Sequence, residues 1–524
     1  MQESEMKKIA KRVLIVLGII VLILGIAAAA LFFYFRNRFM GPTVEIKDPD
    51  SAAIVTTTYG DVRGYISDNG IYTYHGIPYA KAEERFVAAT EPDSWDGVLD
   101  TTEWGPISPQ GAILGGSANE EDNGDNNCQN LNLWTPALDD GKRPVMVWLH
   151  GGGFSSGSAN GGNTDGTNLA LNQDVVVIGV NHRLNVYGYL DLTEYGEKYE
   201  HSDNAGLTDI VASLDWIKEN VAAFGGDPEN ITVFGQSGGG AKVLSLMTSP
   251  YAEGKFQKGI VQSGATETLG VTFATKEQSL AITDKILTKL GITEANIEDI
   301  QTVSNADLQN AATEALAETG AEFEVPLAIG DGYGMEWGPV IDGDYMPSAP
   351  ITEDGFADAG FDVPLLIGSN IDEWAMAGLR RDATDEEKAL FAKAYPNEPE
   401  SGANTVDTLI RLPMLKIMSH KADQGGANVY AYMFTHQEGA MGAFHGAEIS
   451  YAFYNSSEKN GMNELISSVW TNFARNGVPS ADGLENWEPY SRENPATMIL
   501  DDKSYLTVGH DEELMHSLAP DYEW

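Results

Sequence analysis

A single serine stands among glycines directly behind an apolar run, in the stretch ITVFGQSGGGAK at residues 231–242. A G-x-S-x-G sequence between a strand and a helix is typical of a sharp turn that exposes a nucleophilic hydroxyl. Ser237 has this setting, because ITVF is expected to be a strand and the alanine-led segment behind it can be helical. Glycines suit the turn because side chains there would clash with neighbouring elements. We therefore predict Ser237 to be the nucleophile of an acyl transfer, with a flexible glycine loop as the alternative.

A second glycine loop follows another predicted strand, in the stretch WLHGGGFSSG at residues 148–157. Acyl transfer places negative charge on the former carbonyl oxygen, and converging backbone N–H groups can stabilise that charge. The expected donors come from this loop and from the residue after the nucleophile, Gly238. A phosphate-binding loop is the competing interpretation, but no Gly-Lys-Ser/Thr sequence follows these glycines.

A serine nucleophile needs a base, and in this arrangement the chain order is serine, then acid, then histidine. The histidines that follow Ser237 are His420, His436, His445, His510 and His516. His445 lies between Gly442 and Gly446, in a loop behind a predicted strand at 429–436. The others end a strand, belong to a lysine-flanked helical pattern or lie in the acidic C-terminal tail. We therefore favour His445 as the base, and a purely structural histidine is the alternative.

The acid is expected behind a strand that lies between the serine and the histidine in the chain. Asp372 and Glu373 both follow the apolar run VPLLIGSN at 363–370 almost at once. The acid of a triad holds the imidazole in the correct tautomer and stabilises its cationic form. Spacing alone leaves both carboxylates open.

Six short apolar runs must position these groups: 145–150, 175–181, 231–236, 259–264, 363–370 and 429–436. Such runs are typical of strands buried on both faces of a parallel sheet. Between two of them, residues 207–225 repeat apolar side chains at helical spacing. The alternation of strands and helices predicts an α/β fold of the doubly wound kind, with the site at the carboxyl ends of the strands.

Together these motifs resemble the type-B carboxylesterase family, the cholinesterase-like branch of the α/β-hydrolases. The resemblance covers roughly residues 53–500 and rests on segments such as YHGIPYA, HGGGF, NHRLNVYGYL, FGGDPENITVFGQSGGG, GSNIDEW and FHGAEISYAF. It implies an α/β-hydrolase fold with a mostly parallel central sheet flanked by helices, in a bacterial-type exported member. It also implies a serine carboxylesterase that hydrolyses esters through an acyl-serine intermediate, without a metal or organic cofactor.

The resemblance assigns roles to individual residues. Ser237 matches the family's nucleophile, Glu373 its triad acid and His445 its base. The family's oxyanion donors match Gly152, Gly153 and Gly238. The family usually has G-E-S-A-G, whereas this chain has Gln236 and Gly238 around the serine. The neutral Gln236 should weaken any preference for cationic substrates, and Gly238 keeps its N–H on a looser backbone.

The chain has one cysteine, Cys128, so no intramolecular disulfide can form. By resemblance, Cys128 occupies a half-cystine position of the family, and Ser108 stands where its partner would be. The segment AKAEERF at 80–86 is also shorter than the family's proline-rich segment. The rim of the substrate gorge is therefore expected to differ.

The 524-residue chain is strongly acidic, with 32 Lys and Arg against 77 Asp and Glu and a formal charge of −45. This balance argues against nucleic-acid binding, which needs a basic surface. It is explained by a solvated, self-repelling surface, since no calcium loop of the EF-hand kind is found in the sequence.

The N-terminal residues differ from the rest of the chain. Residues 13–35 carry no charge and would span about 34 Å as a helix, enough to cross a bilayer. Basic residues are denser before this span than after it, which predicts a cytoplasmic N-terminus and an extracytoplasmic catalytic domain. We expect a basic stub at 1–12, a transmembrane anchor at 13–35, a linker at 36–52 and a catalytic domain at 53–524. Secretion after cleavage of a signal peptide is the alternative.

The sequence therefore predicts a membrane-anchored carboxylesterase that acts on a small-molecule ester. A non-catalytic, cholinesterase-like adhesion ectodomain is the rival interpretation, but the triad and oxyanion positions are all filled in this chain. Amides or lactones as substrates, the acyl and alcohol specificity, and the oligomeric state all stay open.

Overall fold

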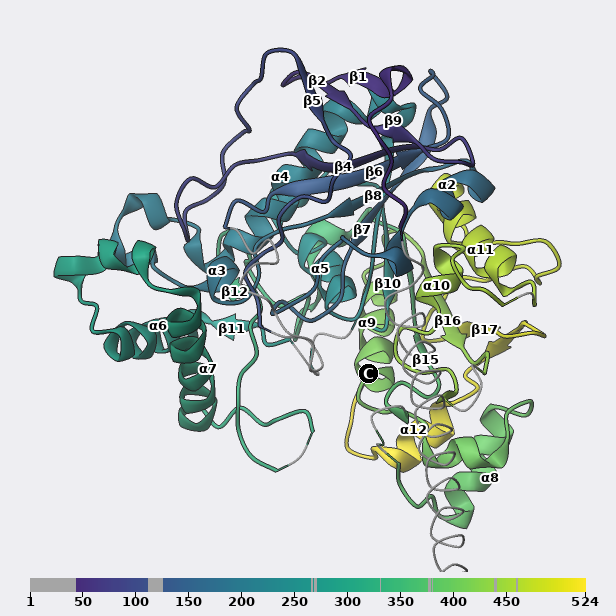
Figure 1. The fold of residues 1–524 in the computed structure, drawn as a ribbon. Helices are drawn as coiled ribbons and strands as arrows, with labels where there is room; N and C mark the ends of the chain where they lie inside the picture. The colour runs from purple at the N-terminus through teal and green to yellow at the C-terminus, as the bar shows by residue number, and fades with distance from the viewer. Residues whose placement is uncertain are drawn as a thin grey trace, which may run out of the picture.

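An eleven-stranded sheet runs through the centre of the protein (Figure 1). The computed structural model describes residues 44–524 except 112–125, 265, 266, 268–270, 330, 376, 377, 379, 438–440 and 459. The strands of the sheet, in spatial order, are β18 (Tyr505–Val508), β17 (Ala496–Leu500), β16 (Val429–Phe434), β15 (Leu365–Asn370), β10 (Lys258–Gln262), β9 (Gly226–Gln236), β7 (Arg143–Leu149), β8 (Val176–Val180), β6 (Asn130–Thr135), β4 (Tyr72–Pro78) and β3 (Tyr65–Ile66).

The centre of this sheet is parallel and its edges are antiparallel. Every neighbouring pair from β17 to β8 is parallel. β18 pairs antiparallel with β17, and β6, β4 and β3 pair antiparallel at the other edge. The six strands predicted from apolar runs are β7, β8, β9, β10, β15 and β16, all in the parallel centre. The predicted α/β architecture is therefore confirmed, as a large mixed sheet.

Helices cover both faces of the sheet because its strands are apolar on both faces. On β7, Val145, Val147 and Leu149 belong to one core cluster, which includes residues of α4 (Ala205–Asn220), α5 (Gly238–Leu246) and α9 (Arg411–Asp423). Met146 and Trp148 point the other way, into a second cluster with α2 (Thr167–Gln173) and α11 (Met462–Asn476). Side chains of a strand alternate between faces, so one apolar run supplies both clusters.

The remaining elements surround this framework (Figure 1). A third apolar cluster joins α3 (Asn185–Tyr189), α6 (Lys276–Leu290) and α7 (Asn305–Glu322). The shorter elements are β1 (Ile54–Thr56), β2 (Asp61–Arg63), β5 (Val98–Asp100), β11 (Ala274–Thr275), β12 (Val340–Ile341), β13 (Ile351–Thr352), β14 (Gly355–Phe356), α8 (Asp385–Ala394), α10 (Ile449–Ala452) and α12 (Glu512–Leu518).

The expectation of a C-terminal tail is corrected by the structure, whereas the expectation of an N-terminal anchor is not tested by it. The residues expected to form an acidic C-terminal tail include the helix α12, whose Leu514 and Met515 are buried in the second cluster. Those two apolar side chains dock the helix although its surface is acidic. The predicted anchor at 13–35 lies outside the described residues. Within the described part of the chain, no helix combines the length and the apolar character needed to cross a bilayer.

Candidate active site

Ser237 occupies a strained turn between β9 and α5. Its backbone has φ 58° and ψ −126°, outside the conformations that a serine prefers. A Cβ placed on Gly235 would lie 2.4 Å from the carbonyl carbon of Gly239, so the turn is too tight for a side chain there. The Ser237 N–H donates to the Gln262 carbonyl at 2.8 Å, which ties the turn to β10. The turn expected from the glycine pattern is therefore present at the carboxyl end of β9.

The second glycine loop lies against the turn that carries Ser237. Gly152 and Gly153 have φ values of 93° and 61°, which favour glycine. A Cβ on Gly238 would lie 2.3–2.5 Å from the backbone O, Cα and N of Gly153. The loop and the start of α5 are therefore in backbone contact. This contact gives a steric reason for the unusual Gly238, which had been expected only to loosen the backbone.

Glu373 and His445 come together from the loops behind β15 and β16. The His445 Nδ1 lies 2.5 Å from the Glu373 Oε2, and the His445 backbone N–H donates to the Glu373 carbonyl at 2.9 Å. The other carboxylate oxygen of Glu373 accepts from the Asn370 N–H at 2.8 Å. A carboxylate can only accept, so Nδ1 carries the proton and Nε2 is left with its lone pair.

Burial lowers the pKa of His445, but the charge of Glu373 and its hydrogen bond outweigh burial, so the pKa is raised above its ordinary value. The side chain of Glu373 is fully buried and that of His445 is 15% exposed. The imidazole is therefore held from behind while one edge stays accessible from outside.

The structure also separates the two adjacent acids that spacing could not. The Asp372 carboxylate accepts from the Thr405 hydroxyl at 2.5 Å and from the Ala443 N–H at 3.1 Å. The Asp372 N–H donates to the Ala443 carbonyl at 3.1 Å. Asp372 thus ties down the loop that carries His445, whereas Glu373 contacts the imidazole itself.

The Gln236 side chain occupies the other ring nitrogen of His445. Its amide nitrogen donates to the His445 Nε2 at 3.1 Å. Among the described residues, no hydrogen bond joins this nitrogen to the Ser237 hydroxyl. The sequence indicated only that Gln236 is neutral. Its contact with His445 depends on how β9 and the loop behind β16 are placed relative to each other, which no local pattern reports.

Two further contacts of the site were not expected from the sequence. The indole of Trp374 stacks on the His445 ring, with centroids 4.6 Å apart and planes at 23°. The buried Glu448 accepts from Asn370 at 2.6 Å and from Gln262 at 3.1 Å. Burial and the charge of Glu373 raise the pKa of Glu448. Trp374 directly follows Glu373 and Glu448 lies three residues after His445, and this nearness in the chain was the only available signal.

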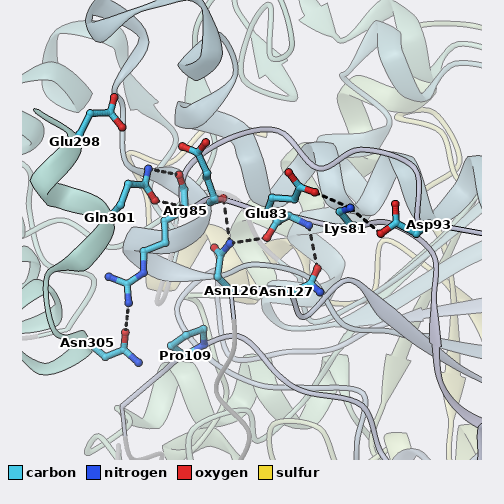
Figure 2. Close-up of a pocket in the computed structure, with 12 residues that line it drawn as sticks. Lys81, Glu83, Arg85, Asp93, Pro109, Asn126, Asn127, Glu298, Gln301 and Asn305 are labelled. Atoms are coloured by element: carbon cyan, nitrogen blue, oxygen red, sulfur yellow. Dashed lines mark hydrogen bonds and ion pairs between the residues drawn. The ribbon is translucent and has the colours of Figure 1, made fainter.

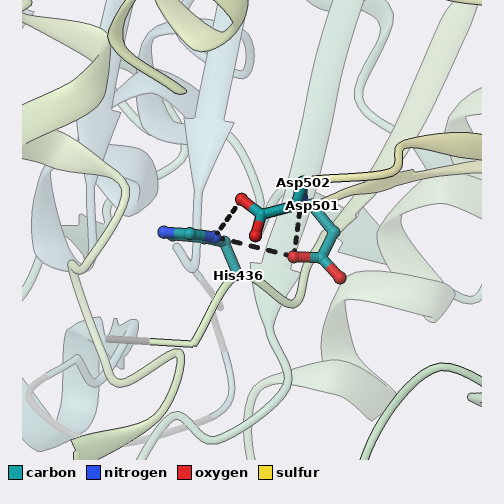
Figure 3. A group of neighbouring side chains, drawn as sticks. All are labelled: His436, Asp501 and Asp502. Carbon is teal, nitrogen blue, oxygen red and sulfur yellow. Dashed lines mark hydrogen bonds and ion pairs between the residues drawn. The ribbon is translucent and has the colours of Figure 1, made fainter. Parts of the chain in front are cut away.

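A separate group of candidate metal ligands lies at the start of the loop that leads to His445. His436, Asp501 and Asp502 are the one such group among the described residues (Figure 3). The His436 Nδ1 lies 3.1 Å from an Asp502 oxygen, and Nε2 lies 3.5 Å from a Glu458 oxygen. Burial lowers the pKa of His436, but these carboxylates outweigh it and raise the pKa. The contacts of His436 with these carboxylates account for the group without a metal ion.

A polar surface pocket lies away from this chemistry (Figure 2). Its lining includes none of the predicted catalytic or oxyanion residues. Lys81 pairs with Glu83 at 2.6 Å and with Asp93 at 2.8 Å, and Arg85 donates to Asn305 at 3.0 Å. Both basic side chains are therefore already bound to neighbouring residues, and we assign this pocket no chemistry.

The strained serine turn, the adjoining glycine loop and the paired histidine and glutamate lie behind parallel strands of one sheet, which defines the class as a serine hydrolase with an α/β-hydrolase-like fold. The chain belongs to the carboxylesterase family, whose family model matches residues 51–395 and 397–515. It is a carboxylic ester hydrolase, and the non-catalytic adhesion alternative is not favoured.

Individual relatives agree with this placement. A para-nitrobenzyl esterase of Bacillus subtilis (strain 168) is 34% identical over 495 residues, covering 88% of this chain and 96% of that protein. A phenmedipham hydrolase of Pseudarthrobacter oxydans is 32% identical over 494 residues, covering 86% and 95%. The solved structure of an esterase from anaerobic Clostridium hathewayi, described as able to hydrolyse aliphatic aromatic polyesters, is 30% identical with a TM-score of 0.80, covering 91% of this chain and 99% of that one.

Proposed function

We propose that Ser237, His445 and Glu373 form the catalytic triad of this esterase, with oxyanion donors from Gly152, Gly153 and Gly238. The observation that carries the proposal is the pairing of His445 with Glu373, which leaves Nε2 unprotonated on the side of the serine turn. A hydroxyl is a weak nucleophile unless an adjacent base takes its proton.

In the first half of the reaction, the Ser237 proton passes to the His445 Nε2 while the Ser237 oxygen attacks the ester carbonyl carbon. The tetrahedral oxyanion is stabilised by the glycine N–H groups. The bond to the alcohol oxygen then breaks, and this oxygen takes the proton from Nε2. The products are the free alcohol and an acyl-serine.

In the second half, water takes the place of the alcohol. His445 removes a proton from the water as it attacks the acyl carbon, and the same proton then returns to the Ser237 oxygen as the acid leaves. Glu373 keeps its negative charge throughout and stabilises the imidazolium. The Gln236 amide must leave Nε2 before the first proton transfer, because one lone pair cannot accept from both side chains at once.

The experiment that tests this proposal compares the full chain with Ser237→Ala on short-chain p-nitrophenyl esters. We expect the variant to lose hydrolysis down to the uncatalysed background with an unchanged thermal midpoint. Retained hydrolysis would show that another residue is the nucleophile.

Membership of the family indicates the class of substrate but not the individual ester. We infer small-molecule carboxylic esters, since relatives are named for para-nitrobenzyl ester and phenmedipham hydrolysis. The Clostridium hathewayi relative adds polyesters to the substrates worth screening. A screen of esters with stepwise changes in acyl and alcohol groups, with matched amides and lactones, would define the range.

We also propose that the enzyme is anchored in the cell membrane through residues 13–35, with the catalytic domain outside. The support is the uncharged span and its denser basic flank on the N-terminal side. Membrane fractionation and protease protection, with intact-mass measurement of the purified protein, test the proposal. An intact N-terminus in the membrane fraction is expected, whereas a shortened protein released from the cells would indicate a cleaved signal peptide.

A further inference from the structure

A lysine lies buried behind the glycine loop, on the helix that follows the nucleophile. Lys242 belongs to α5 and is fully buried. Its Nζ donates to the His150 carbonyl at 2.9 Å and lies 5.5 Å from the centre of the Phe154 ring. His150 and Phe154 are the first and last residues of the H-G-G-G-F sequence, so one side chain contacts both ends of the loop.

The surroundings of Lys242 are uncharged or basic. Among the described residues, no carboxylate forms an ion pair with it. The rings of His150 and His182 stack beside it, with centroids 5.0 Å apart. Burial and then the charge of Lys242 lower the pKa of both histidines, so both are neutral. Burial lowers the pKa of Lys242 itself to about 7.

An amine in such a place costs stability, because removing an ammonium from water without a counter-ion is unfavourable. A buried apolar side chain of similar length would avoid this cost but would leave the His150 carbonyl without this donor. The contacts of Lys242 therefore need an explanation other than packing.

The glycines between the two contacts are held only through their backbone, as by the Ser156 N–H that donates to the Gly152 carbonyl at 3.0 Å. Gly152 and Gly153 have no side chains to anchor them, and glycine loses more conformational freedom on ordering than any other residue. Oxyanion stabilisation depends on donors that are already in place when charge develops. Fixing both ends of the loop is an effective way to keep those donors in place.

We propose that Lys242 is a positioning residue of the oxyanion loop, holding His150 through its carbonyl and Phe154 through its ring against the helix that begins behind Ser237. The inference rests on the proposed roles of Ser237 and the glycine N–H groups. Lys242 touches no reacting atom; it acts through the backbone of residues 150–154.

The structure offers a matched control in Lys421. This lysine is also fully buried, donates to the Phe361 carbonyl at 3.1 Å and lies 5.7 Å from the Phe356 ring, and it donates in addition to the Gln424 side chain at 3.0 Å. Phe361 precedes β15 at its amino end, whereas Glu373 follows the carboxyl end of the same strand. Lys421 thus makes the same two kinds of contact as Lys242, with a carbonyl and a phenylalanine ring, but at the amino ends of the strands, away from the site.

The experiment compares full-length, detergent-solubilised Lys242→Met and Lys421→Met with the wild type. For each protein, kcat and KM on p-nitrophenyl butyrate, the inhibition constant of a trifluoromethyl ketone and the thermal midpoint are measured. For Lys242→Met we expect kcat to fall about 10-fold, a KM within twofold and ketone binding weakened by the same factor as kcat/KM. The thermal midpoint should stay close to that of the wild type, since removal of a costly buried amine offsets the loss of its hydrogen bond to the His150 carbonyl. Lys421→Met should keep the wild-type kcat.

Two results would overturn the inference. One is a Lys242→Met enzyme with kcat within twofold of the wild type, and the other is a loss of kcat that follows a lowered thermal midpoint. If Lys242→Met does not fold, Phe154→Leu decides in its place: a lower kcat at unchanged KM supports the clamp, and an unchanged kcat contradicts it. Activity that survives Ser237→Ala would instead refute the proposed function and leave these comparisons without their basis.

Discussion

The Gln236 amide is hydrogen-bonded to the His445 Nε2, the atom that must accept the Ser237 proton in the proposed mechanism. In the free enzyme Gln236 holds that atom, at 3.1 Å. A hydrogen bond of this kind is worth about 1 kcal/mol. In the proposed mechanism, the Ser237 hydroxyl therefore has to replace the Gln236 amide at this nitrogen.

Removing the competing amide should speed the reaction of the serine. For Gln236→Leu we expect Ser237 to react with a fluorophosphonate up to about fivefold faster than in the wild type, the factor that about 1 kcal/mol allows. Stopped-time labelling with a fluorescent fluorophosphonate measures this rate. A slower reaction at an unchanged thermal midpoint would show that Gln236 assists the triad instead of occupying it.

The pH profile should report the raised pKa of His445. Only the neutral imidazole can accept the serine proton, so kcat/KM should rise with pH through an apparent pKa above 6.5. In Gln236→Glu a carboxylate would replace the amide beside Nε2 and stabilise the imidazolium. The acidic limb of the pH profile, where kcat/KM rises, should therefore move to higher pH by about 1 to 3 units. A limb that stays in place in Gln236→Glu would mean that the two side chains do not meet in solution.

The two adjacent acids should separate by function. Glu373→Gln is expected to lower kcat by about 10⁴-fold, since an amide no longer favours the required tautomer. Asp372→Asn should cost far less, because an asparagine can still accept from the Ala443 N–H. Steady-state kinetics of both variants on one p-nitrophenyl ester test this prediction. A large loss of kcat in Asp372→Asn alone would show that Asp372, and not Glu373, is the acid of the triad.

Gly238 should tolerate no side chain, although the family usually has alanine there. A Cβ at this position meets the backbone of Gly153 at 2.3–2.5 Å, so one of the two segments must move. We expect Gly238→Ala to lower kcat by about 10²-fold, comparable to the loss of one oxyanion donor. Gly161→Ala is the control, since Gly161 has extended backbone and no atom within 4 Å of an added Cβ. Equal kcat in the two variants would contradict this steric account.

Much of this site could be predicted because its parts are carried by local patterns. The apolar runs of β9, β15 and β16 marked the strands, and the loops behind them carry Ser237, Glu373 and His445. The edge strand β3 has two residues, too few for a periodic signal. The helix α12 packs on the second cluster through two apolar side chains. Because the segment around them is acidic, its sequence predicts an exposed tail instead.

The contacts that could not be predicted join residues far apart in the chain. Gln236 meets His445 only after the four strands β9, β10, β15 and β16 have been placed side by side in the sheet. Lys242 meets His150 only after β7 has been placed beside β9. The choice of Glu373 over Asp372 likewise depends on which carboxylate faces the loop behind β16. These outcomes are set by side-chain direction at strand ends, and spacing along the chain carries no record of that direction.

The most direct measurement is to locate the covalent bond that the proposed mechanism requires. The full-length enzyme is treated with a fluorophosphonate, digested and examined by peptide mass spectrometry, beside Ser237→Ala treated in the same way. We expect one modification per chain, on Ser237, and none in the variant. Modification of another residue in the wild type, or undiminished modification of Ser237→Ala, would contradict the account.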